Sequence, residues 1–516
     1  MGHGGSIRSV VGIAAAGACL IAAPSASAAD LYVDDGGSDG GGFNGCANPA
    51  SPCKTIAHAI LVADGNASPT DSVRVGGGSY SEAVSLPPGI SLLKDVFGPG
   101  FGTIGAATIN GGASPAVTVE PGAPMRQLGG EFVFKGDSDH DQGSVLVAGG
   151  ANAGYVTISG ATFNDTATFK QLDILDGSPR VTSNTFTATI DSPNREAIRY
   201  EGDGSPEIGG NSIGPSGAAT SAYLEGVHVK GVGGSATPSI HDNAISGIGV
   251  DIADTGGTGI RLETASGQIS GNTIHKAPSG ATQAGIRVEG NATATGTPLS
   301  LSRNQAYDFN TGAVIGTEDP VTLSSDVFAD NVAGISLTAP AGVTATGITT
   351  RNNGGSPAEI ALVNTPLTLD SSFLGSAGPV VALIGTSTCT SSFSMSTEAP
   401  GNCGLAPVAS PMFANQAMDD YHLLPGSPLI EAGNPAPPAA GALDLDGTTR
   451  AVDGNGDCIV RRDVGADEFV GPAAACPGPS AATPVVPTPP RKKKCKRKKR
   501  GKRGSASAKR CKKRRK

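Results

Sequence analysis

The sequence predicts an all-β protein whose body is a parallel β-helix, a solenoid in which each coil stacks on the one before it. Two short motifs alternate along the middle of the chain, and the first returns every 27 to 32 residues. Repetition at a fixed period is the mark of a repeat architecture. Aromatic residues make up only 4% of the chain and Trp is absent. A solenoid tolerates this, because each coil buries aliphatic side chains against its neighbours.

The first motif centres on an Asn, with Pro or Gly five residues before it and Phe or Ile two residues after it. Asn tolerates left-handed backbone angles and suits the sharp bend between two strands of one coil. In stacked coils, each such side chain should lie about 4.8 Å from its copy and hydrogen-bond to it. Four clear copies and two weaker ones centre on Asn184, Asn211, Asn243, Asn272, Asn304 and Asp326.

The second motif is a small residue followed by alternating apolar and polar residues. Alternation with period two predicts a short strand with one buried face. The copies are residues 197–201, 226–230, 259–263 and 285–289, with Ile198, Val227, Ile260 and Ile286 expected to face the interior. Two outward columns should then form, one of Arg199, His228, Arg261 and Arg287, the other of Glu201, Lys230, Glu263 and Glu289.

Other repeat architectures fit less well. Heptads are absent, which excludes a coiled coil. The paired motifs occur once per period, whereas a propeller blade needs four strands per repeat. A period near 29 residues exceeds the minimum for one coil, so each coil should also carry a loop.

The two ends of the body differ from its middle. Residues 55–64 predict a short amphipathic helix that ends at Gly65. Strands should follow near residues 72–75 and 83–86, with a turn at residues 87–89. We expect the helix to cover the open apolar end of the first coil. At the other end, residues 471–490 read as a Pro-rich linker and residues 491–516 as a disordered basic tail.

The first 28 residues have the features of a secretory signal. Arg8 precedes an apolar run, residues 10–23, that is too short to span a membrane. Ala26, Ser27 and Ala28 form a small-residue cleavage site, so the mature chain should begin near Ala29. Cys19 raises a lipoprotein alternative. We therefore expect a secreted protein that is extracellular or associated with the cell surface.

Charge is segregated along the chain. Of the 37 Lys and Arg, 18 lie in residues 491–516 and one, Arg8, lies in the signal. The remaining 18 stand against all 45 Asp and Glu, so an acidic body carries a strongly basic tail. In an exported protein the nearest polyanions are anionic wall polymers, anionic lipid and acidic polysaccharide. We expect the tail to bind these and expect no dedicated nucleic-acid partner; a merely solubilising tail is the alternative.

Eight cysteines remain after the signal, and they fall into neighbouring pairs. None forms a CxxC motif or a cluster with zinc-finger spacing. Local disulfides in an oxidising compartment are the simplest interpretation. The expected pairs are Cys46 with Cys53, Cys389 with Cys403 and Cys458 with Cys476, and with less support Cys495 with Cys511.

Both ends of the body resemble secreted bacterial proteins. Residues 31–34, 52–56 and 73–82 (LYVD, PCKTI and VRVGGGSYSE) resemble the pectin-lyase-like β-helix superfamily. Residues 420–433, 444–450 and 463–468 resemble the choice-of-anchor Q module that closes such chains. The resemblance implies a right-handed coil and an extracellular setting. It implies no reaction, because the superfamily includes lyases, hydrolases and adhesins.

These observations divide the chain into six parts. The expected boundaries are a signal peptide at 1–28, an N-terminal cap with the first coils at 29–110, β-helix repeats at 111–405, a choice-of-anchor Q-like module at 406–470, the linker at 471–490 and the tail at 491–516.

The outward face of the second motif is the main candidate binding site. Arg forks suit carboxylates, and a flat parallel sheet would present them at regular spacing to an acidic polysaccharide. A plain solvated face of Arg–Glu pairs is the alternative. The candidate residues are Arg199, His228, Arg261, Arg287, Glu263 and Glu289.

Catalysis on the same face stays open as an alternative. A lyase would need calcium-binding carboxylates and a base, for which Arg261 or Arg287 is available, but the facing of nearby Asp251 and Asp254 is undetermined. A hydrolase would need two opposed carboxylates, and the sequence does not single out a pair.

Calcium is a further candidate ligand. Residues 453–457 place acid or amide oxygens at alternate positions, but an EF-hand would need Glu where Val464 stands. Residues 137–141 are a second acidic run, for which a solvated loop is the simpler interpretation. A plain turn-rich loop is likewise the alternative at 453–457. The predicted Ca²⁺ ligands are Asp444, Asp446, Asp453, Asn455 and Asp457.

Together these features predict a monomeric, non-catalytic β-helix that binds extracellular or cell-wall polysaccharide. The alternatives are a polysaccharide lyase or glycoside hydrolase acting on uronic-acid polymers, and a structural surface stalk or adhesin.

Overall fold

The computed structural model describes most of the chain between residues 28 and 471. The chain divides into two units, residues 1–473 and 474–516, and all described residues lie in the first. The predicted signal sequence up to residue 27, the linker from residue 472 and the basic tail lie outside the described residues. The described ranges are 28–39, 45–65, 70–95, 105–136, 142–150, 155–164, 170–188, 196–215, 223–234, 236–249, 257–277, 284–290, 296–354, 358–375, 379–398 and 402–471.

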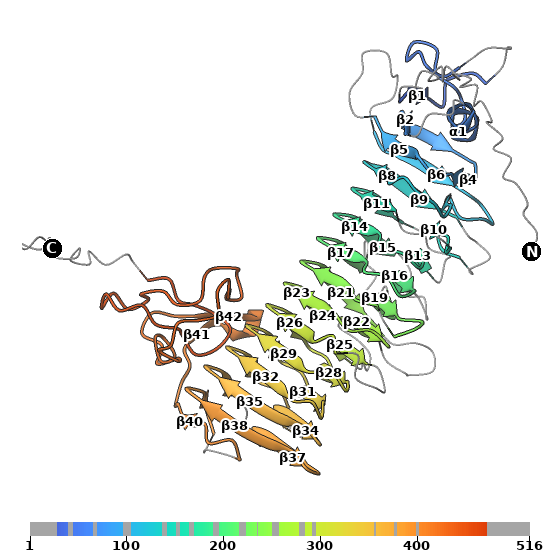
Figure 1. Ribbon diagram of the computed structural model, residues 1–516. Helices are drawn as coiled ribbons and strands as arrows, with labels where there is room; N and C mark the ends of the chain where they lie inside the picture. The colour runs from blue at the N-terminus through green and yellow to red at the C-terminus, as the bar shows by residue number, and fades with distance from the viewer. Residues whose placement is uncertain are drawn as a thin grey trace, which may run out of the picture. The chain divides into compact units, whose positions relative to one another are not determined.

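The body is the predicted all-β solenoid, built from three long parallel sheets that the chain visits in turn (Figure 1). A strand of sheet A is followed by one of sheet B and one of sheet C, and the cycle then repeats one coil further on. Every pairing within these three sheets is parallel, as in β14 with β17 and β16 with β19. The right-handed parallel β-helix expected from the sequence is therefore confirmed.

Sheet A contains fourteen strands among the described residues. Apolar side chains of these strands alternate with outward polar ones, which gives the buried–exposed pattern of a half-buried sheet. Its strands are β1 (Asp30–Val33), β2 (Asp71–Val75), β5 (Ile90–Lys94), β8 (Arg126–Gly129), β11 (Val156–Ser159), β14 (Arg180–Thr182), β17 (Glu207–Gly209), β20 (Ser239–His241), β23 (Gln268–Ser270), β26 (Leu299–Ser302), β29 (Val321–Ser324), β32 (Val343–Thr346), β35 (Pro366–Asp370) and β38 (Thr388–Ser392).

Sheet B also has fourteen described strands, and its inward column stacks like on like. The rings of Phe163 and Phe186, on consecutive coils, lie 4.4 Å apart between centroids and 9° from parallel. The strands are β3 (Gly78–Tyr80), β6 (Ala107–Asn110), β9 (Phe132–Lys135), β12 (Thr162–Phe163), β15 (Thr185–Ala188), β18 (Ser212–Pro215), β21 (Ala244–Ile248), β24 (Thr273–Lys276), β27 (Gln305–Tyr307), β30 (Val327–Ala329), β33 (Thr349–Arg351), β36 (Phe373–Gly375), β39 (Met395–Ser396) and β40 (Ala406–Pro407).

Sheet C has twelve described strands and carries the second sequence motif. Its central strands are longer than those of the other two sheets and show the largest outward charge. They are β4 (Val84–Leu86), β7 (Val117–Val119), β10 (Val145–Val147), β13 (Lys170–Leu175), β16 (Glu196–Glu201), β19 (Glu225–Lys230), β22 (Thr258–Glu263), β25 (Ala284–Glu289), β28 (Thr311–Gly316), β31 (Ala333–Thr338), β34 (Ile360–Val363) and β37 (Val381–Ile384).

The predicted Asn ladder forms at the bend between sheets A and B. The amide Nδ2 of Asn211 donates to Oδ1 of Asn243 at 2.9 Å and to the carbonyl of Val181 at 2.9 Å, and the same pattern repeats along the ladder. One expectation was wrong: the left-handed residue is the one before each Asn, such as Asp242 at φ 53°. The Asn side chain holds the bend by hydrogen bonding and does not itself adopt the strained angle.

Removing one rung of this ladder should cost stability. Asn243 is 1% exposed, donates to Ile208 and Asn272, and accepts from Asn211. Asn243→Ala leaves several buried donors and acceptors unpaired, and we expect a loss of about 2–3 kcal/mol. Urea denaturation of Asn243→Ala beside the exposed-site control Asn110→Ala measures it. Equal losses in the two variants would contradict a structural role for the ladder.

The predicted N-terminal helix is present as α1 (Ile56–Asp64). The Thr55 hydroxyl caps it by accepting from the N–H of His58, and the carboxylate of Glu82 accepts from the N–H groups of Ile56 and Ala57. Its apolar face is buried at the start of the solenoid, beside β1 and β2 (Figure 1). No helix among the described residues is long and apolar enough to cross a membrane.

The C-terminal residues pack against the outer face of sheet B. They contain the antiparallel strands β41 (Phe413–Asn415) and β42 (Asp420–Leu423), joined by the short 3-10 helix η1 (Gln416–Met418). A second apolar core unites Tyr421 and Val464 with Tyr307 and Phe373 of the solenoid. The buried Arg450 adds polar contacts to this junction, since its Nη1 donates to the Oγ of Ser325 at 3.3 Å.

Two of the predicted disulfides are present. Cys46 is bonded to Cys53, and Cys389 to Cys403. Cys458 is also disulfide-bonded, but its predicted partner Cys476 lies outside the described residues, as do Cys495 and Cys511.

Candidate functional site

The outward charged columns occur on sheet C as the alternation predicts. Arg199 pairs in register with His228, His228 with Arg261, and Arg261 with Arg287. Glu201, Lys230, Glu263 and Glu289 form the second column two residues further along the same strands. The apolar residues between them face the core, with Ile198, Val227, Ile260 and Ile286 all fully buried.

The glycine near the start of β19, and the one near the start of β22, are required by close packing. A Cβ on Gly226 would lie 2.7 Å from Cγ2 of Ile245, and one on Gly259 would lie 2.3 Å from Cγ2 of Ile274. Neither glycine has a positive φ, so the constraint is space and not backbone angle. The close approach brings the start of sheet C against the inward residues of sheet B.

His228 lies at the centre of the charged face and is 7% exposed. Its Nδ1 is 2.8 Å from Oε2 of Glu225 and 3.1 Å from Oε1 of Glu196. Its Nε2 is 3.3 Å from Oε2 of Glu263. Three carboxylates therefore surround one imidazole.

The arginines of the face are held by carboxylates from neighbouring coils. Nη1 of Arg261 is 2.9 Å from Glu225, and its Nη2 is 2.8 Å from Glu289. Nε of Arg287 is 2.7 Å from the same Glu289. These pairs link three successive strands, β19, β22 and β25.

The network continues toward the N-terminal coils. Arg199 forms an ion pair with Glu201, which also lies 3.6 Å from Lys230. Lys170 is 2.9 Å from Asp173, the residue in register with Arg199.

Across these five strands the charges are balanced when His228 is protonated. Five Lys and Arg face six Asp and Glu, and the imidazolium supplies the sixth positive charge. The members are Lys170, Arg199, Lys230, Arg261 and Arg287 against Asp173, Glu196, Glu201, Glu225, Glu263 and Glu289.

The surroundings fix the protonation states of the central groups. Burial alone would lower the pKa of His228, but hydrogen bonds and charge from Glu196 and Glu225 raise it to about 10. For Arg261 burial likewise opposes the charge, and Glu289 and Glu225 raise its pKa above the ordinary value. Burial would raise the pKa of Glu225, but His228 and Arg261 lower it. All three groups are therefore charged at neutral pH.

Sequence reasoning missed four members of this network, of which Glu196 and Glu225 contact His228 directly. Each stands immediately before the small residue, so a strict alternation does not assign it to the outward face. The available signal was the repetition of Glu at this position in two successive copies, three residues before Arg199 and His228. Lys170 and Asp173 precede the first copy of the motif that the sequence showed.

The five predicted calcium ligands do not converge on one point among the described residues. Asp446 lies with His422 and Asp467, whereas Asp453 and Asp457 lie with Glu431. Asp444 is 1% exposed, and its Oδ1 accepts the N–H groups of Asp446 and Thr448.

The second group is already occupied by protein donors. Asp453 accepts the N–H groups of Gly456 and Cys458, and Asn455 donates to Glu431. Asp457 lies 3.3 Å from Arg461. Calcium binding stays a prediction. The candidate ligands belong to two separate clusters, one around Asp446 and one around Asp453 and Asp457. The acidic run at 137–141 lies outside the described residues, and so do Asp251 and Asp254.

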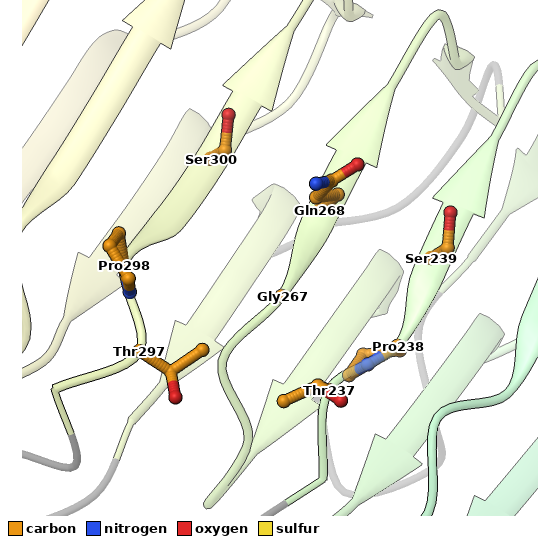
Figure 2. Close-up of a pocket in the computed structure, with 8 residues that line it drawn as sticks. All are labelled: Thr237, Pro238, Ser239, Gly267, Gln268, Thr297, Pro298 and Ser300. Carbon is orange, nitrogen blue, oxygen red and sulfur yellow. The ribbon is translucent and has the colours of Figure 1, made fainter.

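A groove that the sequence did not indicate lies on the outer face of sheet A (Figure 2). It has a volume of about 510 Å³ and spans the starts of β20, β23 and β26. We call it the sheet A groove. Its lining residues are Thr237, Pro238, Ser239, Gly267, Gln268, Thr297, Pro298 and Ser300.

Comparison with known proteins supports the fold. Residues 225–394 match the family described as "Right handed beta helix region". No curated protein matches the sequence. The chain is similar to a pectate lyase, Pel9A, at 11% identity and a TM-score of 0.37, over 86% of this chain and 97% of that one. It is also similar to XylC in complex with xylose, at 11% identity and a TM-score of 0.30, over 68% and 69% of the two chains. At these scores neither structure bears on function.

Proposed function

We propose that this chain is a secreted, non-catalytic β-helix protein that binds a uronic-acid-containing polysaccharide of the extracellular space or cell wall on the outer face of sheet C. The observation that carries the proposal is the continuous network of guanidinium and carboxylate groups across β13, β16, β19, β22 and β25. Such a flat, regularly spaced array suits a polymer better than a small molecule.

An acidic ligand can bind this face, whose positive and negative charges are balanced, by replacing a Glu carboxylate as the partner of an Arg. A uronate carboxylate has the same geometry as the Glu289 carboxylate and can replace it beside Arg287. The side chains of Arg287 and Glu289 are 30% and 36% exposed, so a polymer can reach them. Because the face is close to neutral overall, this binding depends on geometry and not on long-range attraction.

The protonation states favour binding over catalysis. A lyase base must lose its proton near neutral pH. The raised pKa values of His228 and Arg261 keep both protons in place. A hydrolase acid needs a raised carboxyl pKa, whereas the pKa values of Glu201, Glu225 and Glu289 are lowered by their cationic partners despite burial. Burial raises the pKa of Asp173, so this carboxyl is a candidate acid for the alternative enzyme.

The extracellular setting is part of the same proposal. The two internal disulfides are typical of proteins that fold in an oxidising compartment. The basic residues 491–516 would add an electrostatic contact with anionic wall polymer or lipid. That contact is independent of the sheet C face, and it weakens with salt.

Affinity gel electrophoresis with polygalacturonate and alginate tests the proposal. The tail would itself retain an acidic polymer, so the assay uses a chain ending at residue 490 beside the full chain. We expect retardation of the shortened chain and about a tenfold loss of affinity in Arg287→Gln, because one charge-assisted hydrogen bond contributes roughly 1.5–3 kcal/mol. The matched control is Arg74→Gln, an outward Arg of sheet A paired with Asp30 at 2.9 Å.

The same polymers, followed for the ultraviolet absorbance of an unsaturated product, separate binding from lyase activity. Steady product formation would replace the binding proposal with the enzyme alternative. If the acidic polymers do not slow the migration of the shortened chain, the sheet C face does not bind uronic-acid polymers.

A further inference from the structure

We propose that the sheet A groove, together with a row of hydroxyl side chains that extends from it, is a second binding site, and that its ligand is a neutral polysaccharide. The groove is on a different sheet from the charged network and shares no residue with it. The inference therefore goes beyond the proposed binding of uronic-acid polymers on sheet C.

The lining of the groove is polar but uncharged. Ser239, Gln268 and Ser300 project outward from successive strands, and Thr237 and Thr297 stand at the turns before them (Figure 2). Hydroxyl and amide groups both donate and accept hydrogen bonds, which matches the hydroxyls of a sugar. An anionic ligand would find no cation among the eight lining residues.

The groove has no side chain at Gly267, which is itself buried. A Cβ at this position would lie 2.3 Å from the carbonyl oxygen of Pro238, so no side chain fits there. The φ of Gly267 is not positive, and the glycine is needed for the close approach alone. Pro238 and Pro298 stand on either side (Figure 2). Pro238 is buried, and the exposed ring of Pro298 offers an apolar contact to the carbon face of a sugar in a chain that has no Trp.

The row of hydroxyls continues from the groove along the same face. In register with Ser300 on the following strands are Thr322, Thr344, Thr368 and Thr390. All four threonines are exposed. Strands of one sheet lie about 4.8 Å apart, so the row repeats at a constant step.

The charge along this row changes abruptly at the groove. On the N-terminal side the row holds Arg180 and Glu207, which pair with each other at 2.9 Å. From Ser239 to Thr390, across seven strands, the row holds no charged residue. A ligand that matches this row is elongated, repetitive and uncharged, which is the description of a neutral polysaccharide, although Arg450 and Arg462 line a pocket beside Thr322 and Thr344.

Affinity electrophoresis tests this site with soluble xylan, glucomannan and hydroxyethyl cellulose. We expect at least one of these polymers to slow the migration of the full-length protein, because neutral polymers carry no anionic group for the basic tail to bind. The double substitution Gln268→Ala with Ser300→Ala should then weaken that binding by about tenfold or more, since two hydrogen bonds are lost. Both side chains face outward, so the fold should be unchanged, and circular dichroism checks this.

Gln127→Ala is the matched control, because Gln127 is exposed and lies in the same row of sheet A, outside the groove. It should leave binding of the neutral polymer intact, as should Arg287→Gln on sheet C. Failure of all three neutral polymers to retard the chain would overturn the inference. Equal retardation of the wild type and the double variant would also overturn it. The Arg287-dependent binding of polygalacturonate is measured in a separate experiment. Its outcome tests the proposed function independently of the sheet A groove.

Discussion

Replacing Arg450 with methionine should destabilise the C-terminal part of the protein by about 3–5 kcal/mol, the usual cost of breaking a buried ion pair. The side chains of Arg450 and Glu468 are 3% and 1% exposed, and Nε lies 3.1 Å from Oε1. The guanidinium also donates to the carbonyl groups of Gly465 and Asp463. Methionine fills the space but removes the cationic partner of the buried Glu468, which keeps the N–H of Asp463 as a donor, and it takes the guanidinium away from these carbonyls.

Urea denaturation followed by tyrosine fluorescence measures this effect. The chain contains no Trp, and Tyr307 and Tyr421 lie in the core that the C-terminal residues share with the solenoid. Arg180→Met is the control, because Arg180 is 58% exposed in its pair with Glu207, and exposed pairs contribute about 0–1 kcal/mol. Similar losses in the two variants would show that Arg450 does not hold this junction.

The protein should lose stability as the pH rises from about 6.5 to about 10, through deprotonation of His228. The pKa of this imidazole is raised to about 10 in the folded state, where Glu196 and Glu225 outweigh the effect of burial. The unfolded value is near 6.5. A raised folded pKa means that the stabilisation is complete below about pH 6.5 and is lost as the pH approaches 10. The shift corresponds to about 3–5 kcal/mol.

The His228→Gln variant isolates this contribution. His422 also has a raised pKa, about 9, from Asp420 and Asp446 acting against burial, but its effect is the same in both proteins and cancels in their difference. The wild type should exceed the variant in unfolding free energy most strongly near pH 6.5, and the difference should shrink toward pH 10. A difference that stays constant with pH would mean that His228 is not held protonated by its carboxylates.

The elements that depend on local repetition could be predicted from the amino-acid sequence alone. The bend residues Asn184 to Asp326, the inward Ile and Val of sheet C and the helix behind Thr55 all follow from motif spacing and alternation. A stacked coil repeats its own pattern, so the side-chain direction of one strand fixes that of the next. For the same reason the outward columns of Arg199, His228, Arg261 and Arg287 were placed correctly.

The chemistry of those columns depended on contacts that spacing does not determine. Glu196 and Glu225 precede the strict alternation, and the structure places both beside His228 on the outer face. Their carboxylates convert a row of cations into a neutral network and keep His228 charged. The five predicted calcium ligands show the same limit, because residues close in sequence were separated by the path of the C-terminal loops.

The sequence by itself determined that this chain is a parallel β-helix with a capped first coil, because stacking makes each repeat a copy of its neighbour. Only the tertiary structure decided which charges meet, where the C-terminal residues pack and that a groove exists over Gly267. Many of the contacts in those features join residues that are 25 to more than 100 positions apart in the sequence, as in the 2.8 Å pair of Arg261 with Glu289 and the contact of Arg450 with Ser325. Side chains from different coils create them, and no local pattern encodes the distance between coils.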